Sequence, residues 1–146
     1  MDDPEVLAFL QKHLKSIQDN DLDAYHVTTA EDLTLYEWWI TPHRIDGIPF
    51  HDFMMTANAK QGKVFGAEGA KDERAPSRLD LSNLHIQLYG DTAIASYTLL
   101  VSTVTPQGVT VASHNESRVI VKLDGVWKVV HVHKSPAWNA PHVREE

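Results

Sequence analysis

The chain has 146 residues, a formal net charge of -7 and 42% hydrophobic residues, which is the size and composition of one globular domain, residues 1–146, with one core. The acidic balance argues against a nucleic-acid partner, because phosphate backbones are bound by basic surfaces. The absence of cysteine excludes disulfides and thiolate chemistry. No apolar run is long enough to cross a bilayer and the N-terminus lacks a basic signal-peptide start, so we expect no membrane partner and a cytoplasmic location.

The N-terminal part of the sequence predicts two helices and a strand. Asp3 is a suitable N-cap and Pro4 fits the first helical position, and apolar residues then recur at helical spacing until the helix ends near Asn20. Residues 22–28 predict a short second helix. Residues 33–39 are aromatic and β-prone, so a short strand is expected there.

The next segment predicts a third helix followed by a loop. Gly47 and Pro49 precede a short stretch that is consistent with a helix burying its phenylalanines, Phe50 and Phe53, and carrying His51. Residues 60–78 mix Gly, Ala, Lys, Asp and Pro without periodicity, which indicates a loop.

The C-terminal half changes to the period-two alternation of β-strands from residue 79 onwards. Three turn signals divide it: Gly90-Asp91, Pro106-Gln107-Gly108 and Asp124-Gly125. The pattern therefore predicts a meander of four antiparallel strands. The tail after Ser135 contains two prolines and is expected to be extended, with Trp138 tucked back onto the body.

The last hairpin concentrates charge and histidines, and its turn predicts a register. If Leu123 pairs with Val126, a regular antiparallel ladder places Arg118 opposite His131. Because side chains alternate between faces, one face is then polar. Its members are Glu116, Arg118, Ile120, Val129, His131 and His133. The opposite face carries Val119, Val121, Val130 and Val132, interrupted by Lys128 and Ser117.

Helices followed by a run of antiparallel strands predict an α+β fold in which the helices cover one face of a curved sheet. The polar face of the hairpin would line a cone-like pocket, with His51 pointing in toward Arg118 and His131. The apolar face predicts self-association into a homodimer or larger oligomer, because large apolar patches are rarely left in water. The expected interface residues are Val119, Val121, Lys128, Val130 and Val132.

Two segments resemble a known family. DGIPFHDF (residues 46–53) and ESRVIVKLDGVWKVVHVHKS (residues 116–135) are similar, in order and spacing, to segments of the calcium/calmodulin-dependent protein kinase II association domain. The resemblance extends from the first helix to Trp138. It implies the nuclear transport factor 2-like fold, a helix-covered cone with a strongly bent sheet, and assembly through that sheet.

The resemblance also implies roles for individual residues. Arg118 looks like an arginine that lines the family's pocket, and the other matched positions are His51, Glu116, His131 and His133. The strand IASYTLLV lacks the arginine that the kinase domains place near Thr98, so a second guanidinium for an anion would have to come from elsewhere. The chain contains no kinase signature, so it looks like a stand-alone relative.

The candidate ligand-binding residues are Arg118, Glu116, His51, His131, His133, Trp127 and Tyr97. Arg118 either receives an anion such as a small carboxylate or forms a structural salt bridge with Glu116. His131 and His133 either contact a ligand or pack, hydrogen-bonded, beside Trp127, which itself suits a core position.

Three classes of function fit these residues. The first is an oligomerising module with a polar cavity for a small carboxylate. The second is a SnoaL-like isomerase, cyclase or dehydratase whose acid-base group is His51, His131 or Glu116. The third is a metal protein using His131 and His133 with Glu116 or His51, which Arg118 disfavours by repelling a cation. We expect no cofactor, no metal and no hydrolase activity.

Overall fold

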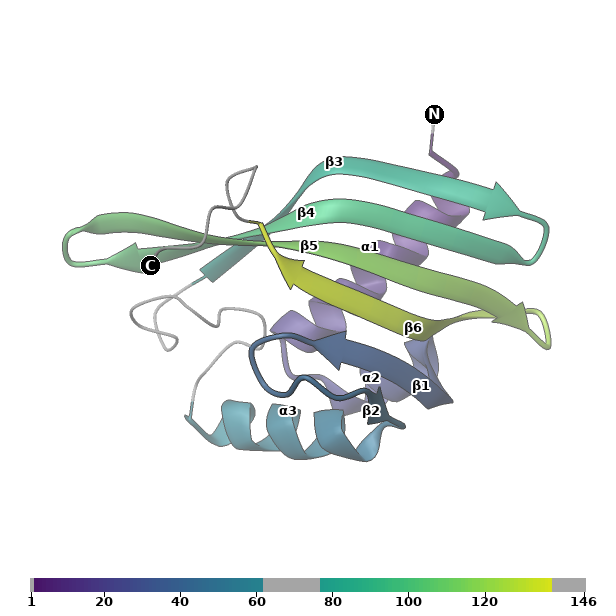
Figure 1. The fold of residues 1–146 in the computed structure, drawn as a ribbon, viewed down its shortest axis with the longest axis horizontal. Coiled ribbons are helices and arrows are strands. Elements are labelled where there is room, and N and C mark those ends of the chain that lie inside the picture. The colour runs from purple at the N-terminus through teal and green to yellow at the C-terminus, as the bar shows by residue number, and fades with distance from the viewer. Residues whose placement is uncertain (1, 62–76, 138–146) are drawn as a thin grey trace.

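The computed structural model describes residues 2–61 and 77–137, which form three helices and a six-stranded sheet (Figure 1). The sheet order is β2-β1-β6-β5-β4-β3. The architecture is α+β, as the sequence predicted. Most of the predicted loop and Trp138 lie outside the described residues.

The helices begin where the capping residues predict. Helix α1 (Pro4–Gln18) starts after Asp3, whose carboxylate accepts a hydrogen bond from the Val6 amide at 3.0 Å. Helix α2 (Leu22–Thr28) starts after Asp21 and has the predicted bounds. Neither these two helices nor α3 (Pro49–Gln61) is long and apolar enough to span a membrane.

The strands form the predicted meander and add a parallel neighbour. Strands β3 (Ser77–Tyr89), β4 (Thr92–Thr105), β5 (Gly108–Leu123) and β6 (Val126–Pro136) pair antiparallel in chain order. Strand β1 (Thr29–Glu37) pairs parallel with β6, and the short β2 (Ile45–Asp46) pairs with β1. The strand predicted at residues 33–39 therefore starts earlier and ends at Glu37.

One face of the sheet, the inner face, packs on the helices. Helix α1 runs across this face in Figure 1, and its Val6 and Leu10 are fully buried against it. The sheet contributes Leu35, Ala95, Leu99, Ile120, Val129 and Val132 to the same core. Helix α3 joins a smaller core through Met55.

The prediction that α3 buries its phenylalanines is wrong for Phe53, which is 71% exposed. Its inward-facing residues are His51, Met55 and Asn58, which recur at helical spacing and are all buried. Phe50 is partly buried against the smaller core.

A β-bulge overturns the predicted register of the last hairpin. Ile120 pairs with Val129 as expected, but the next pair is Val119 with His131, so Val130 is an extra residue in β6. One inserted residue moves every later side chain to the other face. Arg118 therefore lies opposite Val132 rather than His131.

The bulge also corrects the membership of the two faces. Glu116 pairs with Lys134, not with His133. Val132 is 3% exposed and belongs to the inner core, so it is wrong as a residue of the apolar outer face. His131 and His133 project from the outer face, away from Arg118.

Candidate functional site

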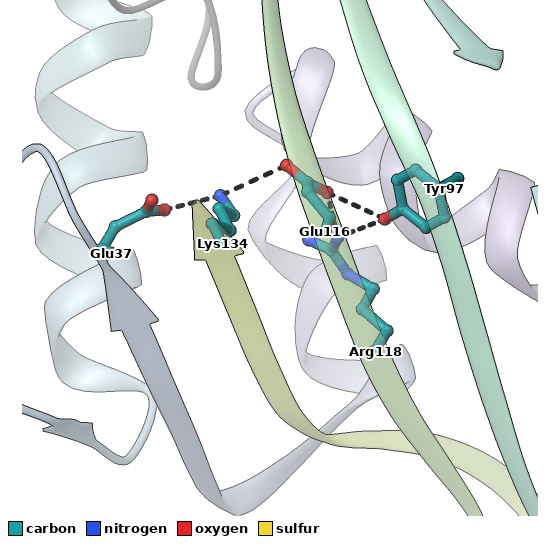
Figure 2. A network of polar contacts seen from close by, with 5 residues as sticks. All are labelled: Glu37, Tyr97, Glu116, Arg118 and Lys134. Atoms are coloured by element: carbon teal, nitrogen blue, oxygen red, sulfur yellow. Dashed lines mark hydrogen bonds and ion pairs between the residues drawn. The ribbon is translucent and has the colours of Figure 1, made fainter. Parts of the chain in front are cut away.

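A row of polar side chains crosses the inner face of the sheet on four neighbouring strands. Tyr97 of β4 pairs with Glu116 of β5, Glu116 pairs with Lys134 of β6, and Lys134 pairs with Glu37 of β1. Arg118 lies two residues from Glu116 on the same face of β5, and Figure 2 shows the five side chains converging. We call these five residues the charge cluster.

The contacts within the charge cluster are direct. The Arg118 Nη1 group donates to the Tyr97 hydroxyl and to Glu116 Oε1, and the Tyr97 hydroxyl donates to Glu116 Oε1 at 2.8 Å. Lys134 Nζ donates to Glu37 Oε1 at 2.5 Å and lies 4.0 Å from Glu116 Oε2. All five residues are buried, so two carboxylates and two cations neutralise one another away from water.

The pKa values of the cluster favour this ionised arrangement. Burial alone would raise the pKa of Glu116, but Arg118, Lys134 and the Tyr97 hydroxyl together hold it below its ordinary value. Burial alone would lower the pKa of Lys134, and Glu37 and Glu116 raise it above the ordinary value. Burial raises the pKa of Tyr97, so its hydroxyl remains a donor.

The helices bring two histidines to the same region. His13 of α1 and His51 of α3 stack on the two sides of Tyr25, with ring centroids 5.6 and 5.1 Å from it. Burial lowers the pKa of both histidines, that of His51 to about 3, and the charges of Arg118 and Lys134 act in the same direction. Both rings are therefore neutral at pH 7, and His51 is a weak base there.

The space beside Arg118 is small. It measures about 10 Å³ and is lined by Leu14, Ile17, Leu79, Leu99, Glu116, Arg118 and Lys134. A site of this size holds roughly one water. Arg118 Nε and Glu37 Oε2 are buried, and neither has a hydrogen-bond partner among the described residues. The site thus keeps one unused donor and one unused acceptor.

Three of the predicted ligand-binding residues lie elsewhere. His131 accepts or donates a 2.7 Å hydrogen bond with Thr34 on the outer face, and Tyr36 contacts the rings of His131 and His133. Trp127 lies near the start of α1, where its indole donates to Glu5 at 3.2 Å. The metal set that joined these histidines to Glu116 or His51 is therefore split between two faces of the sheet. In residues 2–61 and 77–137 no three His, Asp or Glu side chains group as metal ligands would.

The sequence interpretation missed Lys134, Glu37 and His13. Lys134 lies two residues after Val132 on β6, so the two side chains share a face. A register that included the bulge would have placed both of them inward. Glu37 follows Leu33 and Leu35 at period two within the strand predicted at residues 33–39, so the alternation was a usable signal for a third inward-facing side chain. His13 lies one residue before the apolar Leu14, on the buried side of α1.

Comparison with known proteins agrees with this architecture. The family model described as the calcium/calmodulin dependent protein kinase II association domain matches residues 2–138. The rabbit (Oryctolagus cuniculus) calcium/calmodulin-dependent protein kinase type II subunit delta is 26% identical over 140 residues, which cover 94% of this chain and 24% of that protein. This chain thus matches about a quarter of the length of that relative.

Solved structures show the same fold. The S. rosetta CaMKII hub superposes with a TM-score of 0.73 at 26% identity, covering 94% of this chain and 99% of that one. An NTF2-like protein of unknown function from Pseudomonas putida has a TM-score of 0.70 at 15% identity, covering 94% and 87% of the two chains, which shows the fold alone. With its nuclear transport factor 2-like fold, the chain belongs to the calcium/calmodulin-dependent protein kinase II association-domain family.

Proposed function

We propose that this chain is a self-associating domain that forms a homodimer or larger oligomer through the outer face of its sheet. Its family and the similar S. rosetta hub support this role. The observation that carries the proposal is that the described helices cover only one of the two faces of the sheet. The inner face packs on the chain's own helices, whereas no described helix packs on the outer face.

The outer face carries most of the large apolar or aromatic side chains that are exposed in the described residues. These are Tyr36, Tyr89, Val104, Val109, Val111, Leu123 and Val126. Val119, Val121 and Lys128 are half-buried on the same face, and Val130 is the half-buried extra residue of the bulge. Burying this surface against a second copy removes apolar area from water, which is the main favourable term in association.

Light scattering during size-exclusion chromatography tests the proposal. We expect the wild type to be at least dimeric at micromolar concentration and Val119→Glu to shift it toward the monomer, because a charge buried in the contact without a partner is costly. Phe53→Glu is the control, since Phe53 is 71% exposed on α3 and lies on a helix rather than on the sheet. A monomeric wild type would overturn the proposal.

We further propose that Arg118 binds a small carboxylate. Its unused Nε donor supports this, and so does the resemblance of Arg118 to an arginine lining the family's pocket. Glu116 already engages Nη1, so the ligand competes with an internal acid or binds beside it. The ligand also needs more space than the site now has.

Calorimetry with acetate and longer carboxylates is the test. We expect weak binding that Arg118→Ala abolishes and that Arg118→Lys restores poorly, because an ammonium group lacks the planar fork of a guanidinium. No heat from any carboxylate with wild-type protein would leave Arg118 a purely structural partner of Glu116. A SnoaL-like enzyme is the less favoured alternative, because His51 is a weak base and His131 lies on the outer face.

A further inference from the structure

The small cavity beside Arg118 and a larger groove on the surface share a wall. The groove lies between α1 and β3 and measures about 480 Å³. Its apolar lining consists of five leucines: Leu7, Leu14, Leu79, Leu81 and Leu84. Two of them, Leu14 and Leu79, also line the cavity that contains Arg118 and Glu116.

The chemistry changes across this wall. On the cavity side are the charged residues Arg118, Glu116 and Lys134. The Nε atom of Arg118 is buried and has no hydrogen-bond partner among the described residues. On the groove side are leucines, with Gln11 and Lys15 of α1 among the polar residues of the lining. A molecule that occupied both spaces would need a negatively charged head and an apolar body.

We propose that the ligand of Arg118 is a carboxylate with an unbranched apolar tail, its head at the guanidinium and its tail in the groove between α1 and β3. This rests on the carboxylate binding proposed above and names the ligand class. Leu14 and Leu79 form a gate. Leu14 is 7% exposed, whereas Leu79 is only partly buried at the edge of the core, so Leu79 is the side that yields.

The closed gate limits affinity. With room for about one water, the cavity cannot admit a carboxylate until the leucines part. The apparent affinity is then the intrinsic affinity multiplied by the fraction of molecules that are open. A smaller side chain at position 79 raises that fraction. Leu79→Ala is therefore expected to tighten binding, although it removes a partly buried apolar group.

Calorimetry at constant ionic strength with acetate, butyrate and hexanoate tests the tail. Hexanoate should bind wild-type protein more tightly than butyrate, by about fourfold for each added methylene that is buried. Hexanol should bind more weakly than hexanoate, because it lacks the charged head. Equal affinity of the three carboxylates, or of hexanol and hexanoate, would overturn the proposed placement of tail and head.

Variants in the groove test the gate without touching Arg118. Leu79→Ala should improve hexanoate affinity by up to about tenfold if roughly a tenth of the wild-type molecules are open. Leu84→Asn should weaken hexanoate and leave acetate unchanged. Leu88→Ala is the matched control, since Leu88 is 43% exposed on the same strand and lines neither space.

The outcomes separate this inference from the function on which it rests. If carboxylates bind but Leu79→Ala brings no gain over Leu88→Ala, the gate is wrong and the carboxylate site stands. If carboxylates bind with no dependence on length or on Leu84, the tail is placed wrongly. If neither wild type nor Leu79→Ala binds any carboxylate, the carboxylate function fails together with the inference.

Discussion

The two faces of the sheet differ in how their polar side chains are placed: those on the inner face are buried and ion-paired, and those on the outer face are more exposed. On β6, Lys134 is 6% exposed and is held by Glu37, with Glu116 nearby, whereas its neighbour His133 is exposed on the other face. A buried charge without a partner is costly, so the inner face holds its ionised side chains in one paired cluster. The outer face holds histidines and hydroxyl groups that water or a second copy can satisfy.

A single residue decides which side chains face which environment. The extra residue Val130 turns Val132 and Lys134 inward and His131 and His133 outward. Without the bulge the same sequence would place two imidazoles beside Arg118 and leave Lys134 outside. The composition of the candidate site is therefore set by backbone geometry as much as by residue type.

The largest expected effect comes from removing an inner cation. Lys134→Ala leaves Glu37 buried without its cation, and such a loss typically costs about 3–5 kcal/mol of unfolding free energy. Lys128→Ala, on the outer face of the same strand, should change the free energy by no more than about 0.5 kcal/mol. Urea unfolding at one fixed protein concentration measures both. Similar losses in the two variants would contradict the contrast between the faces.

Two tyrosines sharpen the same contrast. Tyr97→Phe removes a hydroxyl that donates to the buried Glu116 carboxylate, and a hydrogen bond to a charged group is worth about 1.5–3 kcal/mol. Tyr36→Phe changes a side chain that is 36% exposed on the outer face, so about 0.5 kcal/mol or less is expected. Thermal or urea unfolding compares the variants. A larger loss of unfolding free energy for Tyr36→Phe than for Tyr97→Phe would show that the outer-face hydroxyl makes the stronger hydrogen bond, and would contradict the contrast.

Much of the fold could be predicted from local signals. Asp3 and Pro4 mark the start of α1, and Asp124 and Gly125 both adopt the positive φ that a two-residue hairpin turn requires. Such features depend on a few neighbouring residues. The alternation of β4 is equally local, and its even and odd positions separate cleanly into outer and inner side chains.

The candidate site was harder to predict because it depends on a bulge and on pairing between distant strands. No residue type near Val130 signals the insertion, since Val is an ordinary strand residue. The partnership of Glu37 with Lys134 also needs β1 to pair parallel with β6, which joins residues far apart in the sequence. The pairing of Arg118 with Glu116 could be predicted from the sequence, because two residues at period two on one strand share a face whatever the register.

The buried histidines predict a pH dependence that originates on the inner side. The pKa of His51 is about 3 in the folded chain and near 6.5 when unfolded, so between these values only the unfolded chain binds the proton. Stability therefore falls as the pH falls below about 6.5, by about 2 kcal/mol at pH 5. Burial lowers the pKa of His13 and adds to the loss.

Urea unfolding between pH 7 and pH 5 measures this effect. His51→Gln should flatten the pH dependence relative to wild type, whatever it costs at pH 7. His26→Gln removes a solvent-accessible histidine that pairs with Asp52 and serves as the matched control. An unchanged slope in His51→Gln would mean that His51 takes up a proton in the folded chain as readily as in the unfolded one.

A smaller effect than those of the inner-face variants is expected from a hydrogen bond on the outer face. Thr34→Val removes the hydroxyl that bonds His131, and because both residues are only half-buried, water can replace the lost partner. We expect a loss of about 1 kcal/mol or less in the unfolding free energy of the dilute protein. If two copies bury this face together, water is excluded there and the same change should weaken association measured by sedimentation.

Leu35→Ala, one residue along on the inner face, should show the opposite pattern, with a loss of about 2–5 kcal/mol in unfolding free energy and little direct effect on association. A Thr34→Val variant that loses folding stability as Leu35→Ala does would show that the outer face is part of the core of the single chain.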